Sequence, residues 1–162
     1  MNNKSYFKPL EDYFENISKS SKYIGSFIPM SEGALDDVIA NKPVYPFLVL
    51  VDYEGKLNAN HQRTITTRTV TFAILFECKT DDKLGQRLRV NEAEGIGLQI
   101  LSKIEHDSFC NEIDWLDKAF IKESVHFTKL EYLEYENLHG IEFSFDLKIK
   151  NPLNYDSNFW VN

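Results

Sequence analysis

Residues 141–150 constrain the fold most, because they alternate strictly between apolar and polar side chains. Glu142, Ser144, Asp146 and Lys148 separate the apolar positions. A period of two predicts a β-strand with one face buried and the other in water. The apolar positions are Ile141, Phe143, Phe145, Leu147 and Ile149. We expect this strand to close the order strand, strand, helix, strand, strand.

Two segments in the first half of the chain predict a β-hairpin. Residues 47–53 form a nearly continuous apolar run, which is typical of a strand covered on both faces. Residues 64–78 begin with alternating Thr and Arg and then become apolar on both sides. We therefore expect the second strand to project from the body at its start and to enter the core at its end. Polar residues 54–63 contain Gly and Asn and predict a long, exposed loop between the two strands.

Apolar spacings of three and four predict two main helices. The first runs from about residue 9 to 19 and carries Pro9 in its first turn, which suits a helix start. The second runs from about residue 81 to 106, and its acidic start suits the positive end of a helix. Gly95 and Gly97 within it favour close packing on a sheet over the alternative of a hinge. Its apolar stripe consists of Ala93, Ile96, Gly97, Ile100, Leu101 and Ile104.

The remaining segments complete a single α+β domain over residues 1–162. Residues 23–30 predict an irregular or short extended piece, and Ser31 can cap a short helix that reaches Ala40. Residues 115–120 predict one or two helical turns. The third strand is expected from Val125 to Tyr135, with a bulge between Phe127 and Leu130. A turn at residues 136–140 follows, in which Gly140 can take a positive φ. The predicted architecture is an N-terminal helix and then β-β-α-β-β, with a mainly antiparallel sheet packed on one long helix.

Composition excludes several classes of function. The formal net charge is −7 and the pI is about 5.1, whereas nucleic-acid binders normally carry a basic patch, so we expect no sequence-specific nucleic-acid binding. No segment reaches the roughly 20 apolar residues of a membrane span, and the N-terminus has no secretory pattern. Cys78 and Cys110 are predicted to be reduced thiols. We therefore expect a cytoplasmic protein.

Catalytic and metal-binding patterns are missing from the sequence. His61, His106, His126 and His139 do not show metal-ligand spacing, and no phosphate-binding loop or nucleophile elbow occurs. The densest titratable set, residues 105–107, suits the C-terminal end of a helix. We expect no cofactor, no metal and no enzymatic activity. The alternative is an enzyme whose site a single sequence hides, assembled for example from Asp52, His126 and Tyr132. We disfavour it, because active sites usually leave a cluster of perturbed charge and these residues show none.

The segment 54–68 gathers positive charge in an otherwise acidic chain, through Lys56, His61, Arg63 and Arg68. One interpretation is an ordinary polar hairpin tip. The other is a protruding arm that docks on an acidic surface of a partner or of a neighbouring copy, or that adds a strand to another sheet. The tail, residues 151–162, contributes Phe159 and Trp160, which are either exposed or docked. The predicted interface therefore consists of six residues: Lys56, His61, Arg63, Arg68, Phe159 and Trp160.

The order of elements resembles the tail-terminator and neck proteins of long-tailed bacteriophages, and small prophage proteins of Bacteroidetes-type genomes. The resemblance covers residues 10–160 and includes the opening LEDYFENIS, the strand YPFLVL and the closing HGIEFSFDLKIKNPLNYDSNFW. It implies a non-catalytic structural protein that forms a ring, commonly a hexamer, and contacts tail-tube or connector proteins. It also implies a place in the host cytoplasm during assembly and in the virion afterwards.

Within that resemblance, the ring's lumen tends to be acidic, which agrees with the net charge of −7. The arm with Lys56, Arg63 and Arg68 would contact a neighbouring subunit or the tube. The alternative function is a small adaptor or binding domain of a mobile element, which acts without catalysis as a monomer or dimer.

Overall fold

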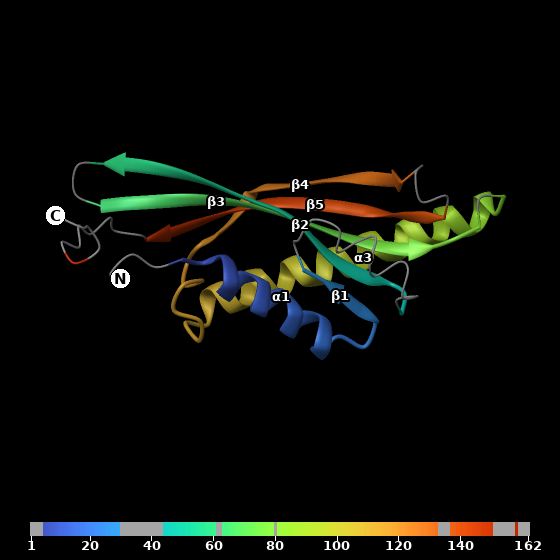
Figure 1. Ribbon diagram of the computed structural model, residues 1–162, viewed down its shortest axis with the longest axis horizontal. Coiled ribbons are helices and arrows are strands. Elements are labelled where there is room, and N and C mark those ends of the chain that lie inside the picture. The colour runs from blue at the N-terminus through green and yellow to red at the C-terminus, as the bar shows by residue number, and fades with distance from the viewer. Residues whose placement is uncertain are drawn as a thin grey trace.

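One mixed sheet with two helices on the same face makes up the part of the chain that the structure describes. The computed structural model describes residues 5–29, 44–60, 63–79, 81–132, 137–150 and 158, and only the backbone at 59–60, 63–64 and 131–132. The five strands lie in the order β1-β2-β3-β5-β4 (Figure 1). The elements are α1 (Phe7–Ser20), β1 (Ser26–Ile28), β2 (Phe47–Asn60), β3 (Arg63–Glu77), α3 (Lys83–Phe109), β4 (Phe120–Tyr132) and β5 (Leu138–Lys150). The predicted α+β class is confirmed.

Both predicted helices form where the apolar stripes place them. In α1 the buried stripe includes Leu10, Phe14 and Ile17. The N-cap of α3 is Asp82, whose carboxylate accepts a hydrogen bond of 2.8 Å from the Gly85 N–H, as acidic caps do. Buried side chains of both helices share one core with the strands, so α1 and α3 cover the same sheet face.

The two predicted hairpins are present and meet at the centre of the sheet. β2 and β3 run antiparallel, as predicted, and so do β4 and β5. The hairpins join through an antiparallel β3–β5 pair, in which Phe72 faces Phe143 with ring centroids 5.1 Å apart. The alternation in β5 is confirmed, because all five of its predicted core positions are buried. Ser144 is buried on the other face, where the Thr71 hydroxyl donates to its oxygen at 3.2 Å.

The sheet is mixed rather than purely antiparallel, because residues 26–28 form the short strand β1. Ser26 lies opposite Phe47 in a parallel pair with β2. Parallel neighbours need a long connection, and residues 29–46 supply its length. The predicted helix from Ser31 to Ala40 lies outside the described residues, as does the tail at 151–157 and 159–162.

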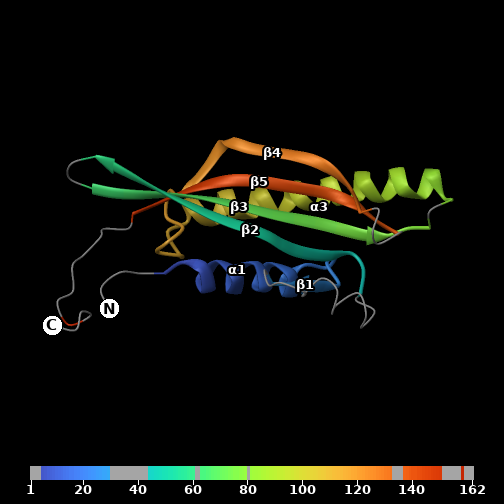
Figure 2. The same ribbon diagram turned by 45° about the horizontal axis from the view of Figure 1, so that its top comes forward.

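Residues 54–60 and 63 lie in strands and not in a loop, which corrects the sequence-based expectation. β2 continues to Asn60, and β3 begins at Arg63, directly opposite it. Polar side chains do not prevent a strand when the ladder of backbone hydrogen bonds continues. The hairpin therefore extends as a paired ribbon well past the helices (Figures 1 and 2).

The second hairpin also differs from its prediction in three respects. β4 starts at Phe120 instead of Val125, and its irregularity lies between Ile121 and His126, not between Phe127 and Leu130. There the Ser124 hydroxyl accepts from the Asp146 N–H at 2.7 Å, replacing a ladder bond. Gly140 lies within β5 rather than in a turn. A Cβ there would overlap the carbonyl oxygen of Ile74, so close approach of the neighbouring strand, not a positive φ, requires glycine at this position.

The two helical glycines have different surroundings. A Cβ on Gly97 would overlap the Phe143 ring, so the prediction of close helix–sheet packing is confirmed there. Gly95 is exposed, and a Cβ on it would meet nothing within 4 Å. Close packing therefore explains the glycine at position 97 but not the one at position 95.

Candidate functional site: the arm and its open edge

The arm, residues 54–68, is a two-stranded ribbon in its described parts, 54–60 and 63–68, and its described side chains point to two opposite faces. Glu54 lies opposite Thr69, Gly55 opposite Arg68, and Lys56 opposite Thr67. Successive residues of a strand face opposite sides. The ladder therefore places Lys56 and Arg68 on different faces, whereas the sequence-based prediction grouped them in one positive patch.

Arg68 lies on the inner face, the one that carries the helices. Its guanidinium carbon is 5.3 Å from the centroid of the Tyr53 ring, a cation–π arrangement. A Cβ on Gly55 would overlap the guanidinium, so the Arg68 side chain crosses the space that this glycine leaves. Phe7 of α1 meets the same tyrosine edge-on at 5.8 Å. Arg68 is therefore half-buried and held against the body of the protein.

Lys56 is exposed on the outer face, where charged residues lie in two adjacent rows. One row runs across the strands from Lys56 through Thr67 to Lys148. The next row runs from Glu54 through Thr69, whose hydroxyl donates to the Asp146 carboxylate at 2.7 Å. A basic row thus lies beside an acidic row.

The other predicted interface residues are placed only in part. Arg63 lies in β3 opposite Asn60, with its backbone alone described. His61, Phe159 and Trp160 lie outside the described residues.

Along the arm, the outer edge of β2 has no partner strand in the described part of the chain. β1 pairs with β2 only at residues 47–49, and from Leu50 to Asn60 no other described strand occupies that edge. Leu57 stands on this edge with 51% of its surface exposed. Sequence reasoning missed Leu57 and Glu54, although Tyr53 and Leu57 continue the period of two and could have revealed the strand. An open edge offers N–H and C=O groups that can pair with another strand.

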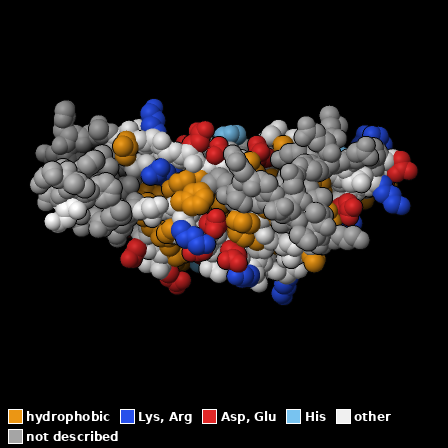
Figure 3. Space-filling model, viewed as in Figure 1, with side chains coloured by type: hydrophobic (Ala, Val, Ile, Leu, Met, Phe, Trp, Pro, Cys, Tyr) orange, Lys and Arg blue, Asp and Glu red, His pale blue; other side chains and the backbone are white. Residues whose placement is uncertain are grey.

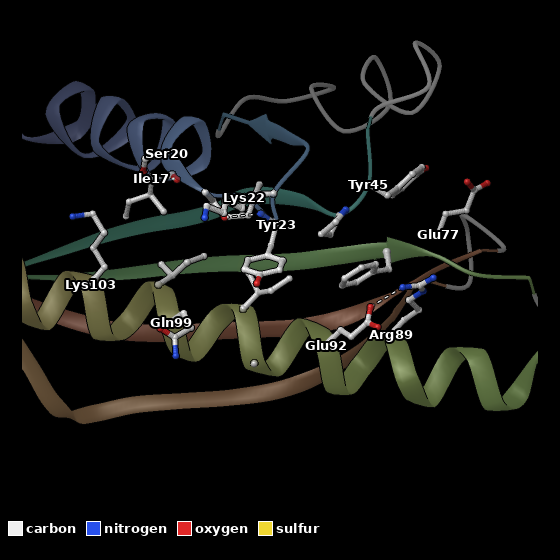
Figure 4. A pocket seen from close by; sticks show the side chains of 17 residues that line it. Ile17, Ser20, Lys22, Tyr23, Tyr45, Glu77, Arg89, Glu92, Gln99 and Lys103 are labelled. Carbon is white, nitrogen blue, oxygen red and sulfur yellow. Dashed lines mark hydrogen bonds and ion pairs between the residues drawn. The ribbon is translucent and has the colours of Figure 1, made fainter.

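A groove of about 890 Å³ lies between the end of α1 and α3. Its apolar lining includes Ile17, Ile24, Phe76 and Ile96, and Gly95 leaves the helix backbone bare beside them. Arg89 and Glu92 form an ion pair of 2.6 Å at its rim, and Lys22 and Tyr23 border the opposite side (Figure 4). Figure 3 shows apolar side chains gathered in the middle of one long side of the molecule, with charges of both signs around them. The groove draws on segments far apart in the chain, so no local pattern reveals it.

A cluster of titratable side chains lies near the C-terminal end of α3. The Tyr13 hydroxyl donates to Asp107 at 2.9 Å, and the Lys103 ammonium lies 2.9 Å from the same oxygen. Burial acts to raise the pKa of Asp107, but the hydrogen bonds from Lys103, Tyr13 and His106 outweigh it, so the pKa is lowered. Burial and the neighbouring carboxylate raise the pKa of Tyr13. The cluster thus holds a charged carboxylate that links the two helices.

The residues of the hypothetical catalytic site do not come together. Asp52, Thr71, Ser144 and His126 occupy one row across four strands. Three strand spacings of roughly 4.8 Å separate the first from the last by about 14 Å. Tyr132 has only its backbone described. Direct cooperation between Asp52 and His126 is therefore excluded in this structure.

The described part of the chain has neither a metal-binding cluster nor a membrane-spanning helix. Within those residues, no group of three or more His, Cys, Asp or Glu side chains could hold a metal ion. Neither described helix is long and apolar enough to cross a membrane. In comparisons with protein-family models, curated proteins and solved structures, nothing matches this chain.

Proposed function

We propose that this chain is a structural assembly protein of a phage or phage-like tail, acting as a tail terminator or neck subunit. It forms a ring through contacts between neighbouring copies. The observation that carries the proposal is a single sheet whose two edges have no further neighbour among the described strands, with one of these edges extending into an arm. The tail assignment itself draws on the resemblance in the order of elements.

The sheet edges supply the ring contact. Among the described strands, β4 pairs only with β5, and β2 beyond Val49 pairs only with β3. An edge of one copy that pairs with the other edge of the next is a heterologous contact, and such contacts close into rings when the rotation permits. We expect β2 of the arm to meet β4 of the neighbour, so that the sheet continues between subunits.

Charge supports the same assignment. The net charge of −7 suits a lumen that passes DNA without binding its sequence. The row through Lys56 and Lys148 gives the arm a local basic surface, which can meet an acidic neighbour or tail-tube protein. The partners are tail-tube or connector proteins, in the host cytoplasm during assembly and in the virion afterwards.

The groove favours one alternative function. A cavity of about 890 Å³ with an apolar lining and a charged rim falls within the usual size range of binding sites. A small adaptor domain of a mobile element could use it to hold a partner without catalysis.

Molar mass in solution tests the ring. Light scattering at high concentration, with and without a phage tail-tube protein, should detect a ring with the mass of about six copies when the tube is present. Leu57→Lys places a charge on the arm edge and should reduce the ring fraction. The matched control is Leu98→Lys on α3, because Leu98 is similarly exposed, 45% against 51% for Leu57. Monomer alone under every condition would contradict the proposal.

A further inference from the structure

We infer that the open edge of the arm pairs with the same edge of a second copy when the chain is by itself. The two β2 strands run antiparallel about a two-fold axis at Gly55. This inference goes beyond the proposed ring, because a two-fold contact joins identical surfaces and closes at two copies. It uses the same β2 edge as the ring contact, so the pair and the ring exclude each other.

The charges along the edge fit this axis. Glu54 precedes Gly55 and Lys56 follows it, and both side chains are exposed on the outer face. In an antiparallel pair centred on Gly55, Glu54 of each copy faces Lys56 of the other. Two cross-strand ion pairs form, of the kind that stabilises neighbouring strands.

The neighbouring registers are disfavoured by the same residues. Centring the pair on Glu54 would let Asp52 of each copy face Lys56 of the other, but it would place two glutamates face to face at the axis. Centring it on Lys56 would place two lysines there. Directly opposed like charges destabilise a strand pair. Edge charges usually discourage self-pairing, but here their order selects one register instead.

The inner face is complementary in the same register. Tyr53 of each copy faces Leu57 of the other, which gives the half-exposed Leu57 an apolar partner. The Tyr53 ring is already held by Phe7 at 5.8 Å and by the Arg68 guanidinium at 5.3 Å. Its orientation is therefore fixed before the second copy arrives, which lowers the entropy lost on pairing.

Charge-swap variants test the pair. In Glu54→Lys, lysines face lysines, and in Lys56→Glu, glutamates face glutamates, at two places in each dimer. We expect the dimer dissociation constant to rise about tenfold or more in either single variant. The double variant E54K/K56E restores opposite charges and should return to within about threefold of the unchanged protein. Sedimentation over a concentration series measures these constants, and circular dichroism checks that each variant is folded.

Mixing the two single variants gives the sharpest result. One carries only lysines at the two positions and the other only glutamates, so they should form a heterodimer more stable than either homodimer. When one variant is uniformly labelled with 15N, native mass spectrometry distinguishes the three species by mass. Glu112→Lys, in the exposed segment between α3 and β4, is the charge-matched control and should leave dimerisation unchanged.

Three results would overturn the inference: a protein that stays monomeric at high concentration, a dimer indifferent to both single swaps, or no recovery in either the double variant or the mixture. Failure of the ring is a separate outcome, because it is measured as the absence of a hexamer-sized species with the tube protein. The dimer measurements use this chain alone.

Discussion

At the scale of single residues, Gly95 and Gly97 of α3 are two glycines on one helix with different structural roles. Gly97 lets α3 approach Phe143, whereas Gly95 borders the groove and has open space where a Cβ would be. Neither has the positive φ that would demand glycine. Their substitution by alanine should therefore have opposite effects on stability.

Gly97→Ala is expected to destabilise the fold by about 1–3 kcal/mol, because an added methyl group forces the Phe143 ring to move in a packed core. Gly95→Ala is the matched control and should stabilise by about 0.5–1 kcal/mol, because alanine loses less conformational entropy in a helix. Urea unfolding of both variants measures the difference. Equal stability of the two would contradict the packing role of Gly97.

At the scale of elements, α1 and α3 are linked by the hydrogen bond from Tyr13 to Asp107, 2.9 Å long. Tyr13→Phe keeps the ring that meets Trp115 edge-on at 5.9 Å but removes the donor to a charged group. A loss of about 1–3 kcal/mol at neutral pH is expected. Tyr23→Phe is the control, because Tyr23 is 73% exposed, and it should change stability by less than about 0.5 kcal/mol.

The pH dependence of the Tyr13→Phe effect follows from the lowered pKa of Asp107. Its stabilisation is fully present above the unfolded-state pKa of about 3.9 and is lost as the pH falls through the lower folded-state value. The stability difference between Tyr13→Phe and the unchanged protein should therefore shrink below about pH 4. A difference that stays constant from pH 7 to pH 2.5 would rule out the charged hydrogen bond.

Elements with a strong hydrophobic period could be predicted from the sequence, and those set by pairing alone could not. The alternation in β5 and the stripes in α1 and α3 reflect one buried face each. β1 is only three residues long and exists because Phe47–Val49 offer it a partner. The arm lacks a dominant apolar face, so its polar residues suggested a loop, and the start of β4 was hidden by the irregular pairing at Ser124.

At the scale of the whole molecule, the strands of the sheet differ in how well their backbone amides are protected from hydrogen exchange. β3 has neighbours on both sides from Ile65 to Leu75, whereas the arm part of β2 has one neighbour among the described strands. In dilute protein, hydrogen exchange should be slow throughout that part of β3 and fast at the β2 amides that face the open edge. Mass spectrometry of protease fragments can resolve the two strands. Equal protection of both would show that the edge is covered.

The sequence predicted which region of the chain forms the candidate site, but not how the side chains of that region are arranged. The position of the arm and the exposure of Lys56 agree with the sequence-based interpretation, while the ladder turns Arg68 inward. The groove depends on how α1, residues 45–46, the end of β3 and α3 assemble. The hydrophobic periodicity of the sequence does not predict which distant segments come into contact to form the groove.

Because β3 lies at the centre of the sheet, it should tolerate inserted and deleted residues less well than β2 does. Its odd positions carry Thr67, Thr69 and Thr71, and its even positions carry Val70, Phe72 and Ile74. Deleting one residue in the middle of β3 would turn the apolar set toward water and the threonines toward the core. It would also shift the pairing of β3 with both β2 and β5. β2 already accommodates an extra residue at Val51, so length changes there are absorbed locally. Natural length variation should accumulate at the rim of this sheet and spare its middle.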